Sequence, residues 1–242
     1  MYSRYSFLVL ALTVVYSANA AFAPFIQKCK PEDSKCLKET AQKSIPIFTN
    51  GIPELGVQKL DPFTMKSLDA STPGLKLLLW DITGTGLKDC IAKKVQRDTS
   101  KSKLTVKLQC SVEFKGKYEM KGSLLVLPIE GKGDARVVLR KVVIVADVDV
   151  GDNIGKDGEK HWTIKNWKHT YDLKDKSTIE LENLFNGNEV LGRAARELIA
   201  SSSNEIVKEV GPPIVKAIIA KIIENIENFF QHVPARISEF TD

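Results

Sequence analysis

Several sequence signatures of catalysis are missing from this 242-residue chain. It has no G-x-S-x-G, P-loop or H-E-x-x-H motif, which mark many serine hydrolases, nucleotide-binding proteins and zinc proteases. Histidine is rare, and we expect His161 and His169, which flank the segment 162–168, to lie at the surface and not in a metal site. A serine triad stays open, since its members need not be close in sequence. We expect a protein that is not an enzyme and that needs no cofactor or metal.

Cysteine is also scarce, and none follows Cys110. The four cysteines are Cys29, Cys36, Cys90 and Cys110. An even number in a secreted chain favours two disulfides, for which three pairings are possible. A zinc site is the alternative, but the chain has no C-x-x-C pair and no histidine near these residues. Cys29 and Cys36 are close enough in sequence to close a small loop.

The first twenty residues have the order of a secretory signal peptide. Arg4 is their only charged residue, 7–15 is almost wholly apolar, and Ala18-Asn19-Ala20 ends the stretch with mostly small side chains. We therefore expect cleavage after Ala20 and a secreted, extracellular protein. Residues 21–242 are then expected to form a single domain, and we expect it to be a monomer.

The net charge of +5 is too small to indicate a nucleic-acid-binding protein. Basic residues do gather in one region, at Lys93, Lys94, Arg97, Lys101, Lys103 and Lys107. A solvated hairpin tip explains them best, and transient contact with a membrane surface is the alternative. We expect no nucleic-acid partner.

The segment from Asn188 to Val233 has apolar residues at spacings of three and four, with polar residues between them. This pattern predicts a long helix with one broad apolar face, interrupted only at Gly211-Pro212-Pro213. The apolar stripe is too wide for a coiled coil, and charged residues exclude a membrane span. Such a helix needs a long apolar partner.

Seven or eight strands fill the middle of the chain. Even-numbered positions from Leu104 to Phe114 are mostly apolar, and the odd-numbered ones include lysines and Glu113. This alternation is typical of a strand with one buried face and one solvent-exposed face. Leu78, Trp80 and Ile82 are expected to share a face. We expect turns at Gly116-Lys117 and at 131–134.

A hairpin is expected with its loop at 98–103. If the loop is centred on Ser100, Cys90 lies opposite Cys110 and Val95 lies opposite Thr105. The two sulfurs would then lie within bonding distance. Two free core thiols are the alternative.

A short helix is expected at the N-terminus, beginning after Pro31 and ending or bending at Pro46. The whole pattern predicts an α+β fold, in which a highly curved antiparallel sheet wraps the long C-terminal helix. The space between sheet and helix would be apolar and need not be filled by side chains.

Several short motifs resemble those of the insect takeout and juvenile hormone binding protein family, in order and spacing over nearly the whole mature chain. They are Cys29-x6-Cys36, Gly51-Ile52-Pro53-Glu54-Leu55, Leu60-Asp61-Pro62, Gly86-Leu87, Gly116-Lys117-Tyr118 with Gly122, Leu127-Pro128-Ile129-x-Gly131-x-Gly133, Leu184-Phe185-Asn186-Gly187 and Phe229-Phe230-x-x-Val233-Pro234. The resemblance implies a helix wrapped by a curved sheet, similar to the lipid-binding TULIP proteins.

The same resemblance implies a secreted carrier of small hydrophobic ligands, such as juvenile hormone, fatty-acid or isoprenoid-like molecules, with a role in circadian or feeding control. The hormone-carrying branch has a second disulfide that joins the later sheet to the long helix, and no cysteine is available for it here. A takeout-like member is therefore favoured over a hormone carrier. The alternative is an extracellular interaction protein with a filled core that acts on a receptor or another carrier.

Apolar residues expected on the facing surfaces of sheet and helix are candidates for the wall of a ligand tunnel. They are Phe48, Trp80, Phe114, Val126, Val142, Ile144, Trp162, Ile218, Ile222, Ile226 and Phe229. Tyr118 and Tyr171, the only tyrosines after the leader, are candidate hydrogen-bond donors to a ligand. A tryptophan at position 222 is expected to block binding.

Overall fold

The computed structural model describes residues 23–235, so the expected signal peptide 1–20 lies outside the described residues. In chain order, the elements are α1 (Ser34–Asn50), β1 (Phe63–Asp69), β2 (Leu75–Thr85), β3 (Ile91–Asp98), β4 (Lys103–Leu124), β5 (Leu127–Ile154), β6 (Lys160–Leu173), β7 (Thr178–Leu181), α2 (Glu189–Ser201) and α3 (Ser203–His232). Short 3-10 turns lie at Pro53–Leu55, Leu87–Asp89 and Phe185–Gly187.

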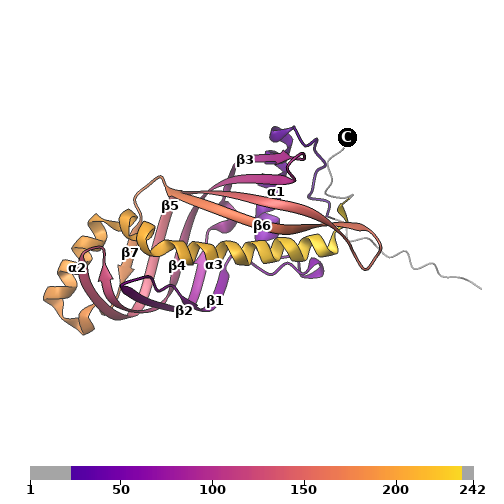
Figure 1. Cartoon of the computed structure of the whole chain (residues 1–242). Helices are drawn as coiled ribbons and strands as arrows, with labels where there is room; N and C mark the ends of the chain where they lie inside the picture. The colour runs from indigo at the N-terminus through magenta and orange to yellow at the C-terminus, as the bar shows by residue number, and fades with distance from the viewer. Residues whose placement is uncertain (1–22, 236–242) are drawn as a thin grey trace, which may run out of the picture.

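The strands form one antiparallel sheet in which β4 and β5 pair along nearly their whole length. The first half of β4 also pairs with β3, and its second half pairs with β2, which in turn pairs with β1. Strand β5 pairs with β7 near its start and with β6 near its end. Two long strands therefore run the length of the molecule, and shorter strands widen the sheet at each end (Figure 1).

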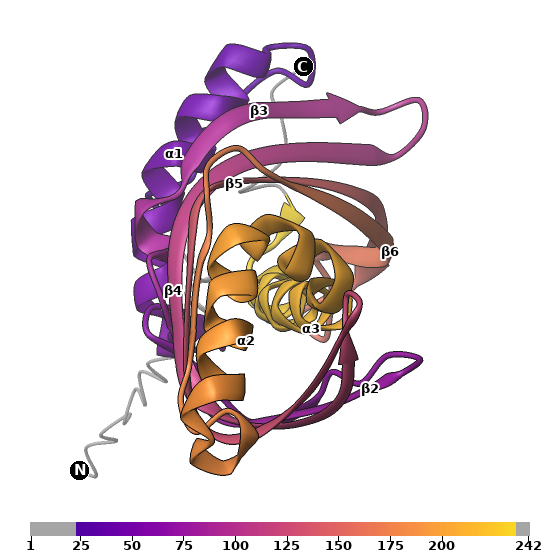
Figure 2. The same cartoon turned by 90° about the vertical axis from the view of Figure 1, so that its left-hand side faces the viewer.

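The sheet curves around α3, which lies along its concave face (Figure 2). It is not closed, because β1 and β6 remain separate edges of the strand order. Helix α1 lies on the outer face, against β3. These features confirm the predicted α+β class, the long C-terminal helix, the short N-terminal helix and the curved antiparallel sheet. No helix within residues 23–235 is long and apolar enough to cross a membrane.

The break in the C-terminal helical region is not where the sequence pattern placed it. Helix α3 continues through Pro212 and Pro213, and the chain changes direction instead at Ser202. Prolines remove two amide donors, but the carbonyls that they leave without partners belong to exposed Lys208 and Glu209, which water can reach. At the true break, the hydroxyl of buried Ser203 donates to the carbonyl of Ser177 at 2.8 Å.

The turns expected at Gly116-Lys117 and at 131–134 are also wrong, since both segments lie inside long strands. The real turn between β4 and β5 lies at 125–126. Glycine is needed at 116 for another reason. A Cβ there would lie 3.0 Å from the carbonyl oxygen of Trp80 on the neighbouring strand. A glycine inside a strand can mark close approach of another backbone, and periodicity alone does not separate that from a turn.

Both disulfides form, as Cys29–Cys36 and Cys90–Cys110. The expected register of the hairpin was only half right. Val95 pairs with Val106 and not with Thr105, and a slip between Ala92 and Lys94 then restores the predicted alignment at Cys90. A β-bulge in β3 thus brings the two cysteines opposite each other.

Helix α1 starts close to the expected position but continues through Pro46 to Asn50. Its N-cap is Asp33, whose carboxylate accepts a hydrogen bond from the amide of Cys36 at 3.0 Å. Of the two outcomes expected at Pro46, an end to the helix is therefore wrong, and a bend stays a prediction. The side chain of Thr49 donates to the carbonyl of Ile45 at 2.8 Å, so the last turn keeps a polar contact.

Candidate functional site

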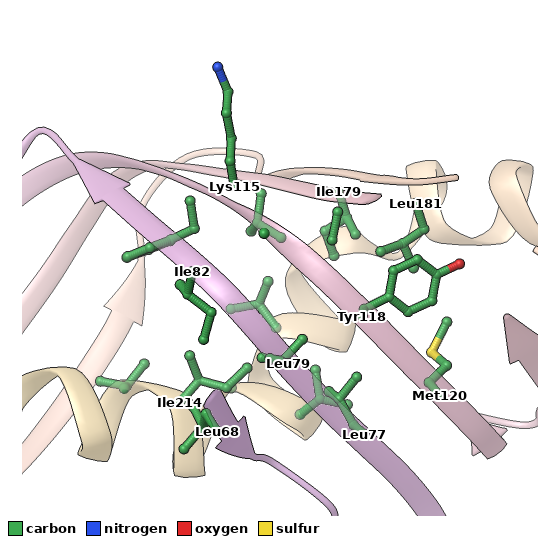
Figure 3. A pocket seen from close by; sticks show the side chains of 18 of the residues that line it. Leu68, Leu77, Leu79, Ile82, Lys115, Tyr118, Met120, Ile179, Leu181 and Ile214 are labelled. Atoms are coloured by element: carbon green, nitrogen blue, oxygen red, sulfur yellow. The ribbon is translucent and has the colours of Figure 1, made fainter. Parts of the chain in front are cut away.

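An apolar cavity of about 160 Å³ lies between the concave face of the sheet and the first half of α3. Strands β1, β2, β4, β5 and β7 supply one wall, and the segment of α3 from Ile206 to Ile218 supplies the other. Figure 3 shows Leu79 of β2, Leu181 of β7 and Ile214 of α3 among the lining side chains, with the side chain of Lys115 extending away from them. The cavity therefore offers hydrocarbon surface on nearly every side.

A bulge at Asp81 decides which side chains of β2 reach the cavity. Leu79 lines the cavity and Trp80 does not; the Nζ of Lys132 lies 5.6 Å from the centroid of the Trp80 ring. Asp81 has a φ of 52°, and the pairing of β2 with β4 slips around it. After the slip, Ile82 lines the cavity. The expectation that Trp80 and Ile82 share a face is wrong for this reason.

Both tyrosine hydroxyls that the sequence offered to a ligand already donate to the backbone. The Tyr118 hydroxyl donates to the carbonyl of Glu182 at 2.7 Å, and the Tyr171 hydroxyl donates to the carbonyl of Val207 at 2.9 Å. Burial, with a smaller effect of the Glu182 carboxylate, raises the pKa of Tyr118 to about 12. Burial also raises the pKa of Tyr171. The Tyr118 hydroxyl thus joins β4 to the chain after β7, and the Tyr171 hydroxyl joins β6 to α3.

Three of the sequence motifs, those that contain Tyr118, Gly131 and Leu184, meet near the Tyr118 hydroxyl. A Cβ at Gly131 would lie 2.6 Å from the Tyr118 hydroxyl, and one at Gly133 would lie 2.7 Å from the carbonyl oxygen of Glu182. Gly131 also forms an isolated bridge with Leu184, at the start of the segment that leads to α2. Both glycines are thus required by the close approach of β5 to the chain after β7.

Two further contacts join the N-terminal loops to the rest of the molecule, and the second of them links two of the sequence motifs. The side chain of Asn225, which is 1% exposed, accepts a hydrogen bond from the amide of Gln58 at 2.6 Å. One carboxylate oxygen of Asp61 accepts from the amides of Gly86 and Lys88, at 3.1 and 2.9 Å. The motifs that carry the family resemblance therefore serve as structural joints of the fold.

The eleven wall candidates lie in different parts of the molecule. Phe114 and Ile218 line the cavity. The adjoining core contains Phe48, Val142, Ile144 and Ile222, and clusters at the far end of α3 contain Trp162 and Phe229. Ile226 is half-buried on α3, and neither Trp80 nor Val126 lines the cavity. Val126 is 91% exposed, at the turn between β4 and β5. The structure thus brings only two of the candidates together at the cavity.

Sequence reasoning missed most of the lining because one helical stripe serves two purposes. Val210, Ile214 and Ile218 recur every four residues and face the cavity. Ile222 continues the same stripe but packs among the filled core side chains. Nothing in the spacing separates the two halves, since the difference is made by where β1, β2 and β7 cross the helix.

The sequence suggested that His161 lies at the surface, and this is wrong. Its side chain is buried far from the cavity, with an exposed fraction of 3%. Its Nδ1 lies 2.7 Å from the carbonyl oxygen of Phe230, and its Nε2 lies 3.0 Å from the carboxylate of Asp157. Burial lowers the pKa of His161, but these two partners outweigh it, so the pKa is raised. No group of three or more His, Cys, Asp or Glu residues within 23–235 is placed to hold a metal ion.

Three comparisons with known proteins agree with one another. Residues 7–237 match the model of the family described as haemolymph juvenile hormone binding protein. The chain is 26% identical over 229 residues to the circadian clock-controlled protein daywake of Drosophila melanogaster, covering 90% of this chain and 88% of that protein. It superimposes on the crystal structure of Epiphyas postvittana Takeout 1 with a TM-score of 0.84 and 30% identity, covering 87% of this chain and 98% of that one.

Proposed function

The chain belongs to the haemolymph juvenile hormone binding protein family, and on this basis we propose that it is a secreted carrier of a small hydrophobic molecule. The observation that carries the proposal is the apolar cavity between the sheet and α3. Two disulfides are consistent with an extracellular protein. The circadian control named for the daywake protein supports a role for this carrier in circadian control.

Burial of apolar surface would drive binding. Each methylene group that leaves water contributes about 0.8 kcal/mol, so a tail with about eight buried methylenes would gain about 6 kcal/mol before loss of motion is counted. An apolar cavity of about 150 Å³ is large enough for benzene. The cavity of about 160 Å³ is therefore suited to a compact apolar group or to part of a hydrocarbon chain.

We propose a takeout-like ligand, fatty-acyl or isoprenoid in character, over juvenile hormone itself. Two observations support this choice. The sequence has no cysteine after Cys110 that could join the later sheet to α3, and the chain resembles Takeout 1 over nearly all of that protein. We also propose that binding involves no chemistry, since the lining consists mainly of aliphatic, aromatic and methionine side chains.

Filling the cavity tests the proposal. Ile218→Trp adds a large side chain at a position that lines the cavity, whereas Ile222→Trp places the same side chain one turn later, outside the lining. Titration with cis-parinaric acid, a fluorescent fatty acid, should show binding by the wild type and Ile222→Trp but not by Ile218→Trp. We therefore expect Ile218→Trp, and not Ile222→Trp, to block binding, because only Ile218 lines the cavity.

Thermal unfolding identifies any variant that loses binding only because it fails to fold. Val137→Phe, on β5, provides a second way to fill the cavity if Ile218→Trp is unstable. The proposal is wrong if folded Ile218→Trp and Val137→Phe both bind the probe as tightly as the wild type does.

A further inference from the structure

A groove runs beside the cavity, between the edge strand β1 and α3. On the sheet side it is bounded by residues around Met65 of β1 and Ile82 of β2. On the helix side it is bounded by Ala217 and Ala220, which lie on either side of the cavity-lining Ile218 in the sequence of α3. The groove therefore continues the path of the cavity toward solvent.

Two residues line both the cavity and the groove, namely Met65 and Ile82. They are direct partners in the pairing of β1 with β2, and both are half-buried. Methionine has three rotatable bonds and adapts easily to a changing space. One cross-strand pair of side chains thus borders both the cavity and the groove.

The two edges of the sheet differ in how they meet α3. At the β6 edge, Ile219 and Ile223 pack with Val148, Val150 and Trp162 in a continuous apolar cluster. At the β1 edge, the helix presents small alanines, and the groove takes the place of such a cluster. In Figure 2, β6 lies beside α3. An apolar molecule would thus meet least resistance at the β1 edge.

The volume and polarity of the cavity set what it can hold. Pockets that hold a whole drug-sized ligand have about 300–1,000 Å³, so the cavity of about 160 Å³ takes only part of a long-chain molecule. A polar head inside it would lose hydrogen bonds with water and find no free hydroxyl, since those of Tyr118 and Tyr171 already donate to backbone carbonyls. The head must therefore stay outside.

The groove supplies the polar surroundings that such a head needs. Lys66, Lys221, Asp81 and Glu224 line it, together with two threonines of β1 and β2. Lys66 is exposed and forms no ion pair with any of the described residues. A head group that sits here would keep contact with water and with both charge signs.

We propose that the groove between β1 and α3 is the portal of the cavity, that Met65 and Ile82 form its gate, and that the ligand is a single-chain amphiphile. Its tail lies in the cavity, and its polar head lies in the groove beside Lys66. This inference rests on the proposed carrier function and adds to it the route of binding, the orientation of the ligand and the shape of ligand accepted.

Binding kinetics test the portal. Ala220 is exposed in the groove, so Ala220→Trp should narrow the portal without disturbing the core, and Ala200→Trp, at an exposed position of α2, is the matched control. In stopped-flow mixing with cis-parinaric acid, Ala220→Trp should slow association about fivefold or more, while Ala200→Trp should leave it unchanged. Met65→Ala should speed both association and dissociation. Unchanged rates in Ala220→Trp and Met65→Ala would overturn the portal.

Photo-crosslinking tests the orientation. A palmitic acid with a diazirine beside its carboxyl should label β1 and the 217–224 segment of α3, whereas one with the diazirine at its tail end should label β2, β4 or β7 near Leu77, Met120 and Leu181. Exchange of the two patterns, or labelling near Trp162 and Phe229, would overturn the inference while leaving the carrier function intact. Absence of labelling by both probes would refute the carrier function itself, and this inference with it.

Discussion

Gly211 and Tyr171 show how an absent side chain shapes α3. The Tyr171 hydroxyl from β6 reaches the helix backbone at the carbonyl of Val207, one turn before Gly211. A Cβ at position 211 would lie 2.7 Å from that hydroxyl oxygen, closer than van der Waals contact permits. Glycine is therefore retained in the middle of a helix, where it is usually less favourable than alanine by about 1 kcal/mol.

Gly211→Ala should lower the free energy of unfolding by about 2 kcal/mol, because overpacking of a buried contact outweighs the better helix propensity of alanine. Tyr171→Phe alone should cost about 1 kcal/mol, since it removes one hydrogen bond. The double variant should be no less stable than Tyr171→Phe, since a Cβ would then meet only the Cγ1 of Val207 at 3.5 Å and the ring Cζ of residue 171 at 3.6 Å, which are ordinary van der Waals contacts. Urea unfolding of the three variants measures this coupling, and additive losses would contradict it.

His161 should make stability depend on pH. Its pKa in the folded protein is raised above 6.5 by the Phe230 carbonyl and the Asp157 carboxylate, despite burial. The stabilisation by the proton is therefore fully present below the unfolded pKa and is lost as the pH rises through the folded pKa.

Urea unfolding of the wild type and His161→Gln between about pH 5.5 and 8.5 should show this loss, with the difference in unfolding free energy largest at the acid end. Asp157, whose pKa is lowered by the same contact, stays charged over that range. A difference that stays constant or grows with pH would contradict the assignment.

At the level of elements, the two disulfides should contribute unequally. Cys90–Cys110 closes a loop with a sequence separation of 20, and Cys29–Cys36 closes one of 7. Loop entropy predicts a loss of about 3 kcal/mol for Cys90→Ala/Cys110→Ala and about 2.5 kcal/mol for Cys29→Ala/Cys36→Ala. Neither pair lines the cavity, so folded samples of both variants should still bind the fluorescent fatty acid. Unfolding experiments under oxidising conditions rank the two losses, and the reverse order would contradict the loop argument.

Periodicity predicted the helices and most strands of this fold. It failed where the surroundings of a proline or glycine in the folded protein override the usual preference of that residue for a helix break or a turn. Pro212 and Pro213 suggested a break that α3 does not have, because the freed carbonyls face water. Gly116 and Gly131 suggested turns, yet both lie inside long strands at points of close approach. For the two glycines the deciding neighbour is far away in sequence, and for the prolines it is solvent, so the local sequence shows neither.

The candidate site was harder to predict than the fold for a related reason. Ile218 and Ile222 lie on the same helical stripe, but only Ile218 lines the cavity. On β2, the bulge at Asp81 brings Ile82 into the cavity lining, while Trp80 stays outside it. Lining depends on bulges and on which strands cross the helix, and both are properties of the assembled sheet.

For the whole molecule, the open sheet and α3 divide the interior into two regions. Around Ile219 and Ile223 the interior is filled by side chains, whereas around Ile214 it contains the cavity. A carrier needs the second region, and an interaction protein with a filled core does not. The cavity therefore supports the proposed carrier over an interaction protein with a filled core.

Native mass spectrometry of the protein purified from a secreting cell line, without detergent, shows whether the protein carries a hydrophobic molecule. We expect a population whose mass exceeds that of the chain by one apolar molecule, which organic extraction removes and which re-forms when long-chain fatty acids are added. A protein that carries nothing on purification and binds none of the added chains would contradict this expectation.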